Sequence, residues 1–411
     1  MSTDNQAFAA GLVTAQQQIE SDCSRCQLCV AECRFLAKYG DPKQIAEQLD
    51  PSDSSSLQLA YECSLCGLCQ AVCPDRLAPQ NLFLEMRREA VRSDSVSLSP
   101  YKGLVAYERK GSSRNFSWYG LPAGCKTVFF PGCALPGSRP QQTQQAFSSL
   151  QQQIPQLGIV LDCCTKPSHD LGRQDYFLST FGELKSFLLQ QGVRQVLVAC
   201  PNCYQVFSEY ATELEVRSIY ELLQPQSHLL GEQAPVPVHL HDPCVTRFAA
   251  PLQQSVRGLV EQLGLPLVET AHSGEKTHCC GEGGAVACLA PELADEWREN
   301  WSKGVTAERT LTYCAGCAQR LNKRTPTSHI LDLLYAPADA LQGKVKVGRP
   351  PLTYLNRLRL KRKLQNSLPV AVSHERGSNL KDSPKSIWRR KRFLAAAVIV
   401  DPSSYEVVVE I

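Results

Sequence analysis

The sequence predicts a multidomain α+β protein, in which a helical N-terminal domain precedes two repeated α/β domains of the Rossmann-like βαβ type. The first observation behind this fold class is helix-favouring sequence, rich in Ala, Gln, Glu and Leu, that runs to about residue 95. The second is an order of strand, cysteine, helix, strand and cysteine that begins near residue 126 and occurs twice. With 411 residues and 43% hydrophobic content, the chain is long enough for several packed domains.

The first α/β domain is expected to contain three short apolar strands, at 127–130, 158–161 and 196–199. Helices are expected between them, one from about residue 140 and one whose apolar face runs through 177–188. Each strand runs into cysteines, which are Cys133, the pair Cys163 and Cys164, and Cys200 with Cys203.

The second α/β domain repeats this order with strands expected at 236–240, 265–268 and 309–313, and with helices after Pro251 and near Pro291. Its cysteines are Cys244, Cys279, Cys280, Cys314 and Cys317. Matched cysteines of the two domains lie at nearly constant separation, since Cys244 follows Cys133 by 111 residues and Cys279 follows Cys163 by 116. This spacing indicates an internal duplication.

Five segments follow from these patterns: a helical domain at 1–95, a linker at 96–124, the two α/β domains at 125–230 and 231–338, and a basic C-terminal tail at 339–411. In the tail, leucines from Leu352 to Leu364 alternate with Arg and Lys, which fits a basic amphipathic helix. Such a helix could meet an anionic membrane surface or an acidic partner, and a solvated or disordered tail fits equally. Nucleic acid is not expected as a partner, because no helix-turn-helix or aromatic context accompanies the charge.

The twenty cysteines are the feature that departs most from an ordinary composition. In a long chain without a signal-peptide pattern they point to metal ligation in a reducing compartment rather than to disulfides. No apolar stretch of about 18 residues occurs. We therefore expect a cytoplasmic protein, with a peripheral position on the inner face of the membrane as the alternative that the basic tail allows.

The N-terminal cysteines follow the spacing that surrounds 4Fe-4S cubes. Both runs have the form Cys-x-x-Cys-x-x-Cys-x-x-x-Cys, and the second ends in Cys-Pro. Because the fourth cysteine of each run ligates the other cluster in two-cluster ferredoxins, we assign two crossed sets. The first four-cysteine set is Cys23, Cys26, Cys29 and Cys73, and the second is Cys33, Cys63, Cys66 and Cys69. Two structural zinc sites are the competing interpretation.

Each α/β domain carries five cysteines, one more than a tetrahedral zinc site needs. The adjacent Cys-Cys pair does not easily place both side chains on one small cube, which favours a larger or split iron–sulfur assembly. The first five-cysteine set is Cys133, Cys163, Cys164, Cys200 and Cys203, and the second is Cys244, Cys279, Cys280, Cys314 and Cys317. Cys125 and Cys288 fall outside these sets and are expected to be free thiols.

This arrangement resembles the cysteine-rich CCG domain of the B-type and D-type subunits of heterodisulfide reductase, which recurs in the iron–sulfur subunits of glycolate oxidase and related dehydrogenases. The resemblance covers roughly residues 15 to 335. It implies two cubane 4Fe-4S clusters and up to two noncubane 4Fe-4S clusters, with disulfide cleavage at a noncubane cluster. One departure is Thr165, which stands where the second copy has Gly281 and the family has glycine.

The resemblance implies that the second five-cysteine set is the catalytic one, and His241 and His278 beside it are the best proton donors. For these histidines, and for Lys166, His169, Asp170, Asp242, Arg247 and Glu282, a structural hydrogen bond is the competing interpretation. The glycines of 281–284 lack Rossmann or Walker spacing, and no flavin or nucleotide is expected in this chain.

Two functions compete at this point. The first is an iron–sulfur oxidoreductase subunit that passes electrons from its cubane clusters to noncubane clusters for heterodisulfide-reductase-like chemistry. The second is a wiring subunit that conducts electrons between a flavin-dependent glycolate- or lactate-type dehydrogenase and quinone. Either function needs a flavoprotein or other redox subunit as partner, and a membrane cytochrome or quinone-reactive protein is a further candidate. A non-redox zinc scaffold or sensor leaves the ferredoxin spacing unexplained.

Overall fold

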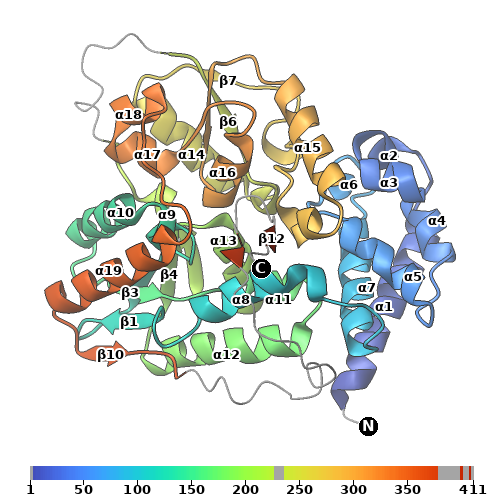
Figure 1. The fold of residues 1–411 in the computed structure, drawn as a ribbon, viewed down its shortest axis with the longest axis horizontal. Helices are drawn as coiled ribbons and strands as arrows, with labels where there is room; N and C mark the ends of the chain where they lie inside the picture. The colour runs from blue at the N-terminus through green and yellow to red at the C-terminus, as the bar shows by residue number, and fades with distance from the viewer. Residues whose placement is uncertain (1–2, 226–235, 378–398, 401–406, 409–411) are drawn as a thin grey trace.

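The computed structural model describes residues 3–225, 236–377, 399–400 and 407–408 (Figure 1). Its N-terminal part, here the ferredoxin-type part, is built of two long helices, α1 and α7, that pack on each other, with shorter helices around them. The helices are α1 (Thr3–Asp22), α2 (Leu28–Glu32), α3 (Arg34–Tyr39), α4 (Pro42–Glu47), α5 (Ser54–Gln58), η1 (Leu59–Glu62), α6 (Leu68–Ala71) and α7 (Pro79–Arg92). The predicted helical N-terminal domain is confirmed.

A six-stranded sheet of order β10-β1-β3-β2-β4-β5 forms the first cysteine-rich unit. Strands β3, β2, β4 and β5 are parallel, and β1 runs antiparallel to β3 and β10. The strands are β1 (Trp118–Leu121), β2 (Thr127–Phe130), β3 (Gly158–Leu161), β4 (Gln195–Val198), β5 (Glu215–Ser218) and β10 (Val372–His374). Alternate residues of β2 face opposite sides, so Phe129 packs under α10 (Pro140–Gln153) while Phe130 packs under α12 (Gln174–Gln190) and α13 (Pro201–Tyr210).

A second, fully parallel sheet of order β7-β6-β8-β9 forms the second cysteine-rich unit. Its strands are β6 (Val238–His241), β7 (Leu267–Val268), β8 (Arg309–Thr312) and β9 (Thr327–His329). Its helices are α14 (Ala250–Gln262), α15 (Pro291–Lys303), α16 (Ala315–Leu321), α17 (Ile330–Tyr335) and α18 (Pro337–Gln342). The predicted parallel-sheet domains are therefore confirmed, although β7 is shorter than the strand expected at 265–268.

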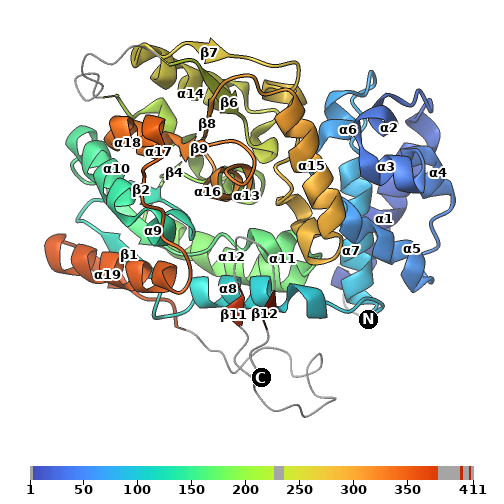
Figure 2. The ribbon, with the colours of Figure 1, turned by 45° about the horizontal axis from the view of Figure 1, so that its top comes forward.

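The two cysteine-rich units share one hydrophobic core. Phe129 and Leu197 of the first sheet belong to the same buried cluster as Leu240 and Leu311 of the second. A buried ion pair also joins the units, because Arg139 Nε lies 2.8 Å from an oxygen of Asp332 in α17. In Figures 1 and 2, α15 is the helix of the second unit that faces the ferredoxin-type part, where it contacts α3.

The segments expected to be a linker and a tail contribute elements to the first cysteine-rich unit. Residues 96–124 contain α8 (Lys102–Gly111) as well as β1. The basic segment contains the predicted helix, α19 (Leu352–Ser367), and then β10, which pairs with β1. Helix α19 packs on α9 (Leu135–Ser138) and buries Leu360 and Leu364, so two of its five leucines are used inside the protein. The rest of the predicted tail from residue 378 onward is described only at β11 (Ile399–Val400) and β12 (Val407–Val408).

Among the described residues, no helix is long and apolar enough to cross a membrane.

Candidate iron–sulfur centres

The two ferredoxin-type runs adopt the same backbone turns. In the first run Arg25 (φ 56°) and Gln27 (φ 66°) are left-handed, and in the second run Leu65 (φ 50°) and Gly67 (φ 69°) take the same conformation at the same positions. A left-handed residue bends the chain between successive cysteines, which allows their three thiols to face one point. Such convergence is the local geometry that a cube with three closely spaced thiolates requires.

The fourth cysteine of each run lies with the other run. One cavity is lined by the whole first four-cysteine set, including Cys73 from the second run. Burial raises the pKa of Cys33 above its usual range, and Cys66 and Cys63 are the neighbours that raise it further. The structure therefore brings together the members of both crossed sets that the spacing predicts. Cys26 is exposed, which places the first four-cysteine set near the surface.

The second five-cysteine set is gathered in one place, and all of its members are buried. Cys244 Sγ and Cys279 Sγ are 4.0 Å apart, and Cys317 Sγ and Cys280 Sγ are 3.2 Å apart. Cys314 caps α16, where its sulfur accepts a hydrogen bond from the amide of Cys317 at 3.5 Å. Strand ends at β6 and β8 thus deliver three of the cysteines, and the loop after β7 delivers the adjacent pair.

Glycines after Cys280 allow the ferredoxin-type part to approach this set. A Cβ atom on Gly283 would lie 2.5 Å from the carbonyl oxygen of Ser64 and 3.3 Å from Cys279 Sγ. A Cβ atom on Gly284 would lie 2.5 Å from the carbonyl oxygen of Cys63. Only glycine leaves room for backbone from both parts here, so this loop serves close packing around the cysteines.

The second four-cysteine set and the second five-cysteine set are neighbours. Cys66 packs against the buried cluster that holds Cys244 and Cys279. Burial raises the pKa of Cys66, and Cys279 is close enough to raise it further. Arg247 spans the junction, because it donates to the carbonyl oxygens of Cys66 at 3.0 Å and Thr277 at 2.8 Å. A charge on one set therefore acts electrostatically on the other.

The first five-cysteine set is grouped in the same way around the ends of β2, β3 and β4. A hydrogen bond from Cys163 lowers the pKa of Cys133 to about 6, and the guanidinium of Arg357 and the hydroxyl of Tyr107 lower it as well. Cys203 lies beside Cys164 and Cys200. Burial and this grouping favour metal binding at the first set, and the anionic form of Cys133 is already stabilised by the cation from α19.

A buried carboxyl group and a tyrosine lie between the two five-cysteine sets. Burial raises the pKa of Glu282, which is close enough to interact with both Cys279 and Cys133. The hydroxyl of Tyr220 lies 3.0 Å from the carbonyl oxygen of Ala199 and 3.4 Å from that of Tyr313. These two carbonyl groups directly precede Cys200 and Cys314, so the two sets face each other across the shared core.

The two predicted proton donors differ in their surroundings. Both ring nitrogens of His241 are buried without a hydrogen-bond partner among the described residues, and burial lowers the pKa of His241 to about 3. Its ring meets Trp301 edge-on, with centroids 5.7 Å apart. His278 shares the carboxylate of Glu32 with His272, and burial lowers its pKa. His241 is thus neutral, and none of the described residues uses the hydrogen-bonding capacity of its ring.

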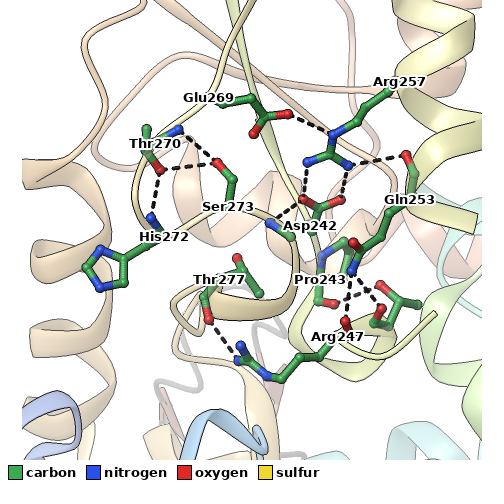
Figure 3. A network of polar contacts seen from close by, with 12 residues as sticks. Asp242, Pro243, Arg247, Gln253, Arg257, Glu269, Thr270, His272, Ser273 and Thr277 are labelled. Carbon is green, nitrogen blue, oxygen red and sulfur yellow. Dashed lines mark hydrogen bonds and ion pairs between the residues drawn. The ribbon is translucent and has the colours of Figure 1, made fainter. Parts of the chain in front are cut away.

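Other residues flagged in the sequence have structural partners. His169 contacts Asp170 at 2.8 Å and the hydroxyl of Tyr210 at 2.9 Å, and Lys166 pairs with Asp170. Figure 3 shows the corresponding network in the second unit, where Asp242 accepts hydrogen bonds from Arg257 at 2.8 Å. These contacts fit the structural interpretation that competed with a catalytic one.

Sequence reasoning missed three side chains that reach the cysteine sets from distant segments. Tyr107 and Arg357 flank Cys133 from α8 and α19. Arg87, fully buried in α7, donates to backbone oxygens of Cys63, Asp170 and Gly284, and so joins all three parts. No spacing pattern identifies them, since each acts through tertiary packing alone.

Comparison with known families agrees with these observations. Residues 22–78 match the 4Fe-4S dicluster domain, and residues 127–208 and 238–322 each match the cysteine-rich domain. The second match confirms that the cysteine-rich domain is duplicated.

Several relatives are named as reductase subunits or as iron–sulfur proteins. The B-type subunit of fumarate reductase (CoM/CoB) from Methanothermobacter marburgensis is 23% identical over 72% of this chain and 66% of its own length. An uncharacterised iron–sulfur protein of Methanococcus maripaludis is 22% identical over 76% of this chain and 72% of its length. The D-type subunit of dihydromethanophenazine:CoB–CoM heterodisulfide reductase from Methanosarcina barkeri is 22% identical over 75% and 90%. The chain thus spans about two thirds of the first relative.

A likeness to a solved structure, aspartate racemase of Picrophilus torridus, has 12% identity, covers 57% of this chain and 98% of that one, and has a TM-score of 0.24, too low to support an inference.

The fold, the cysteine sets and the domain matches define an iron–sulfur electron-transfer subunit with a ferredoxin-type dicluster domain and a duplicated cysteine-rich domain. Within that class the chain is similar to the D-type subunit of heterodisulfide reductase.

Proposed function

We propose that this chain carries electrons from two cubane 4Fe-4S clusters in its ferredoxin-type part to noncubane 4Fe-4S clusters in its cysteine-rich units, for heterodisulfide-reductase-like chemistry. The observation that carries the proposal is the junction where Cys66 and Cys279 lie close enough to interact. A reductase needs such a junction, because electrons that enter one domain must leave in another.

The donor sets fit the proposed clusters. The two four-cysteine sets supply eight thiols in two convergent groups, which would hold the cubanes. The two five-cysteine sets would hold noncubane clusters, with Cys200 and Cys203 or Cys314 and Cys317 at a helix start. When bound, these clusters supply one-electron redox chemistry, and the protein tunes it through burial and hydrogen bonds to sulfur.

The sets differ in exposure in a way that fits one order of electron transfer. The exposed Cys26 makes the first four-cysteine set the entry point for a partner protein. The second four-cysteine set follows, and then the second five-cysteine set, whose members are buried. The first five-cysteine set lies across Glu282 from it.

In disulfide reduction each sulfur that leaves the bond takes up a proton as well as an electron. His241 lies at the second five-cysteine set with two unpaired ring nitrogens among the described residues, and we propose that it hydrogen-bonds substrate there. His278 directly precedes Cys279, and its Nε2 lies 3.4 Å from the Glu32 carboxylate that orients its ring. We propose that these residues position protons, whereas electrons come from the chain's metal centres.

A wiring function is the second candidate, and one observation favours it specifically. All members of the second five-cysteine set are buried, at 9% exposure or less, so a substrate needs an opening that this conformation does not provide. A wiring subunit conducts electrons between a flavin-dependent glycolate- or lactate-type dehydrogenase and quinone, and needs no such opening.

Substitution within the second five-cysteine set separates these functions. Protein with Cys280→Ser and Cys317→Ser would be purified anaerobically and supplied with a chemical electron donor and a small disulfide. The proposal expects loss of disulfide reduction, by at least about 100-fold, with the cubane EPR signals retained. Unchanged disulfide reduction would exclude this set as the active site. Absence of disulfide reduction in the unsubstituted protein, with intact electron transfer to quinone, would favour wiring.

Partners follow from the same reasoning. The relatives are named as subunits of reductases, and we propose a flavoprotein or other redox subunit that docks near Cys26. The exposed Leu352 and Leu355 of α19, beside basic side chains, are the part of the predicted membrane-facing helix that remains available for an anionic surface or a membrane cytochrome.

A further inference from the structure

Two histidines and a glutamate meet at the junction between the ferredoxin-type part and the second cysteine-rich unit. Glu32 is the last residue of α2, His272 lies in the loop after β7, and His278 directly precedes Cys279. The Oε2 atom of Glu32 lies 3.2 Å from Nε2 of His272 and 3.4 Å from Nε2 of His278. One ligand atom from each of the three residues falls within 4.8 Å of the others.

The two imidazole rings lie against each other beside the same carboxylate. The rings of His272 and His278 are stacked, with centroids 3.7 Å apart and planes 28° apart. Both present Nε2 to a single carboxylate oxygen, so the three atoms surround one small volume. Converging imidazole nitrogen and carboxylate oxygen atoms are the ligands that zinc and neighbouring divalent metals take from proteins.

The loop that carries His272 is held in place from its far side. Asp242 accepts a hydrogen bond from the amide of Gly274 at 2.9 Å, and Thr270 Oγ1 accepts one from the amide of His272 at 3.3 Å. Figure 3 shows the ring of His272 pointing away from this network. The backbone is therefore fixed while the ring is left for the contact with Glu32, as expected for a pre-positioned ligand.

We propose that Glu32, His272 and His278 bind one divalent transition-metal ion of the zinc class, separate from the iron–sulfur centres. Three protein ligands leave a fourth position, and the side chains of Glu32 and His272 are 34% and 35% exposed, so water can complete a tetrahedral shell. The two imidazole nitrogens lie 3.2 and 3.4 Å from the carboxylate oxygen, close to the spacing of ligands that share an ion at about 2 Å. The stacked rings turn relative to each other when both nitrogens face the ion.

The ion's place in the fold gives it a positioning role. Glu32 belongs to the run that contains Cys29 and Cys33, and His278 adjoins Cys279. A metal at this point ties the four-cysteine sets to the second five-cysteine set, and so fixes the separation that electrons must cross.

Zinc binding to cluster-loaded protein tests this proposal directly. Anaerobically purified full-length protein would be incubated with zinc sulfate and desalted, and its zinc and iron would be measured by mass spectrometry. X-ray absorption at the zinc edge would then identify the ligand atoms. We expect about one retained zinc per chain with a shell of nitrogen and oxygen only. We expect His272→Ala to lower zinc affinity by at least about 10-fold while the iron content stays unchanged.

His374→Ala is the matched control, because His374 lies in β10, where it stacks on Phe187 in the first unit. It is expected to retain zinc like the unsubstituted protein. Sulfur in the zinc shell would place the ion in a cysteine set and overturn the proposal. Failure to retain zinc, or equal zinc affinity in His272→Ala, would reduce the cluster to a hydrogen-bonded contact and overturn it as well.

Discussion

At the residue scale, Thr165 and Gly281 occupy equivalent places after the paired cysteines but meet different surroundings. Both are left-handed, at φ 56° and φ 84°. A Cβ atom on Gly281 would lie 2.3 Å from the carbonyl oxygen of Ala294, whereas Thr165 fits and donates its hydroxyl hydrogen to the carbonyl oxygen of Cys164 at 2.8 Å. The first copy therefore accommodates its threonine, although a β-branched residue in this conformation costs about 1–2 kcal/mol.

We expect Gly281→Thr to destabilise the protein by about 3 kcal/mol or more, because it adds a backbone clash to the conformational cost. The matched change Thr165→Gly is expected to alter stability by no more than about 1 kcal/mol, since relief of the left-handed cost offsets the lost hydrogen bond. Anaerobic thermal unfolding with iron analysis measures both. Equal effects of the two changes would contradict this explanation.

Glu108 gives the stability a defined pH dependence. It is fully buried in α8, where it accepts a hydrogen bond from the amide of Ser168 at 2.7 Å, and burial raises its pKa from 4.5 to about 7. The folded protein holds the proton of Glu108 more tightly than the unfolded chain does. The protonated carboxyl group therefore adds its full share to the free energy of unfolding below pH 4.5, and this share is lost as the pH rises to 7. The loss amounts to about 3 kcal/mol.

The loss of stability lowers the unfolding temperature between pH 4.5 and 7, and we expect Glu108→Gln to remove most of that decline. The control Glu292→Gln, at an exposed position, is expected to leave the decline in place. Thermal unfolding across that pH range measures the difference. A decline that is as steep in Glu108→Gln as in the unsubstituted protein would show that other groups cause it.

At the element scale, α19 divides its leucines between the protein interior and the surface. Leu364 is 2% exposed and belongs to the main core, whereas Leu355 is 42% exposed. We expect Leu364→Ala to lower the free energy of unfolding by about 2–5 kcal/mol and Leu355→Ala by less than about 0.5 kcal/mol. Denaturant unfolding of both variants measures this. Similar small effects would mean that the helix is an independent tail.

The helix also shows where sequence reasoning reaches its limit. The spacing predicted the members of the four-cysteine sets that lie together, the strands that carry the other cysteines, and α19 itself. It could not predict that Arg357 in α19 lies beside Cys133, because that contact depends on packing between segments more than 200 residues apart. Residues 96–124 look like a linker in the sequence because β1 spans only 4 residues and α8 only 10, too short for either pattern to stand out.

At the scale of the whole molecule, Arg87 connects the ferredoxin-type part to both cysteine-rich units. Its guanidinium donates to the carbonyl oxygens of Asp170 at 2.7 Å, Gly284 at 2.8 Å and Cys63 at 2.5 Å. Lysine cannot reproduce this planar set of donors. We expect Arg87→Lys to cost about 3 kcal/mol and to slow electron transfer between the parts, whereas Arg92→Lys, at an ion pair with Glu89 on the same helix, changes neither.

Rapid mixing with a reductant, followed by freezing and EPR of the cubane and noncubane signals, measures the electron-transfer rate in Arg87→Lys separately from its loss of stability. Unchanged transfer rates would mean that Arg87 stabilises the fold without setting the distance between the cysteine sets.

The most direct measurement is the iron and acid-labile sulfide content of anaerobically purified protein, combined with EPR after dithionite reduction and after oxidation in the presence of thiol. Four 4Fe-4S centres require about sixteen iron per chain, and a noncubane centre that meets substrate gives a thiol-dependent paramagnetic signal. About eight iron with no such signal would leave the five-cysteine sets without iron–sulfur clusters and would contradict the proposed route for electrons.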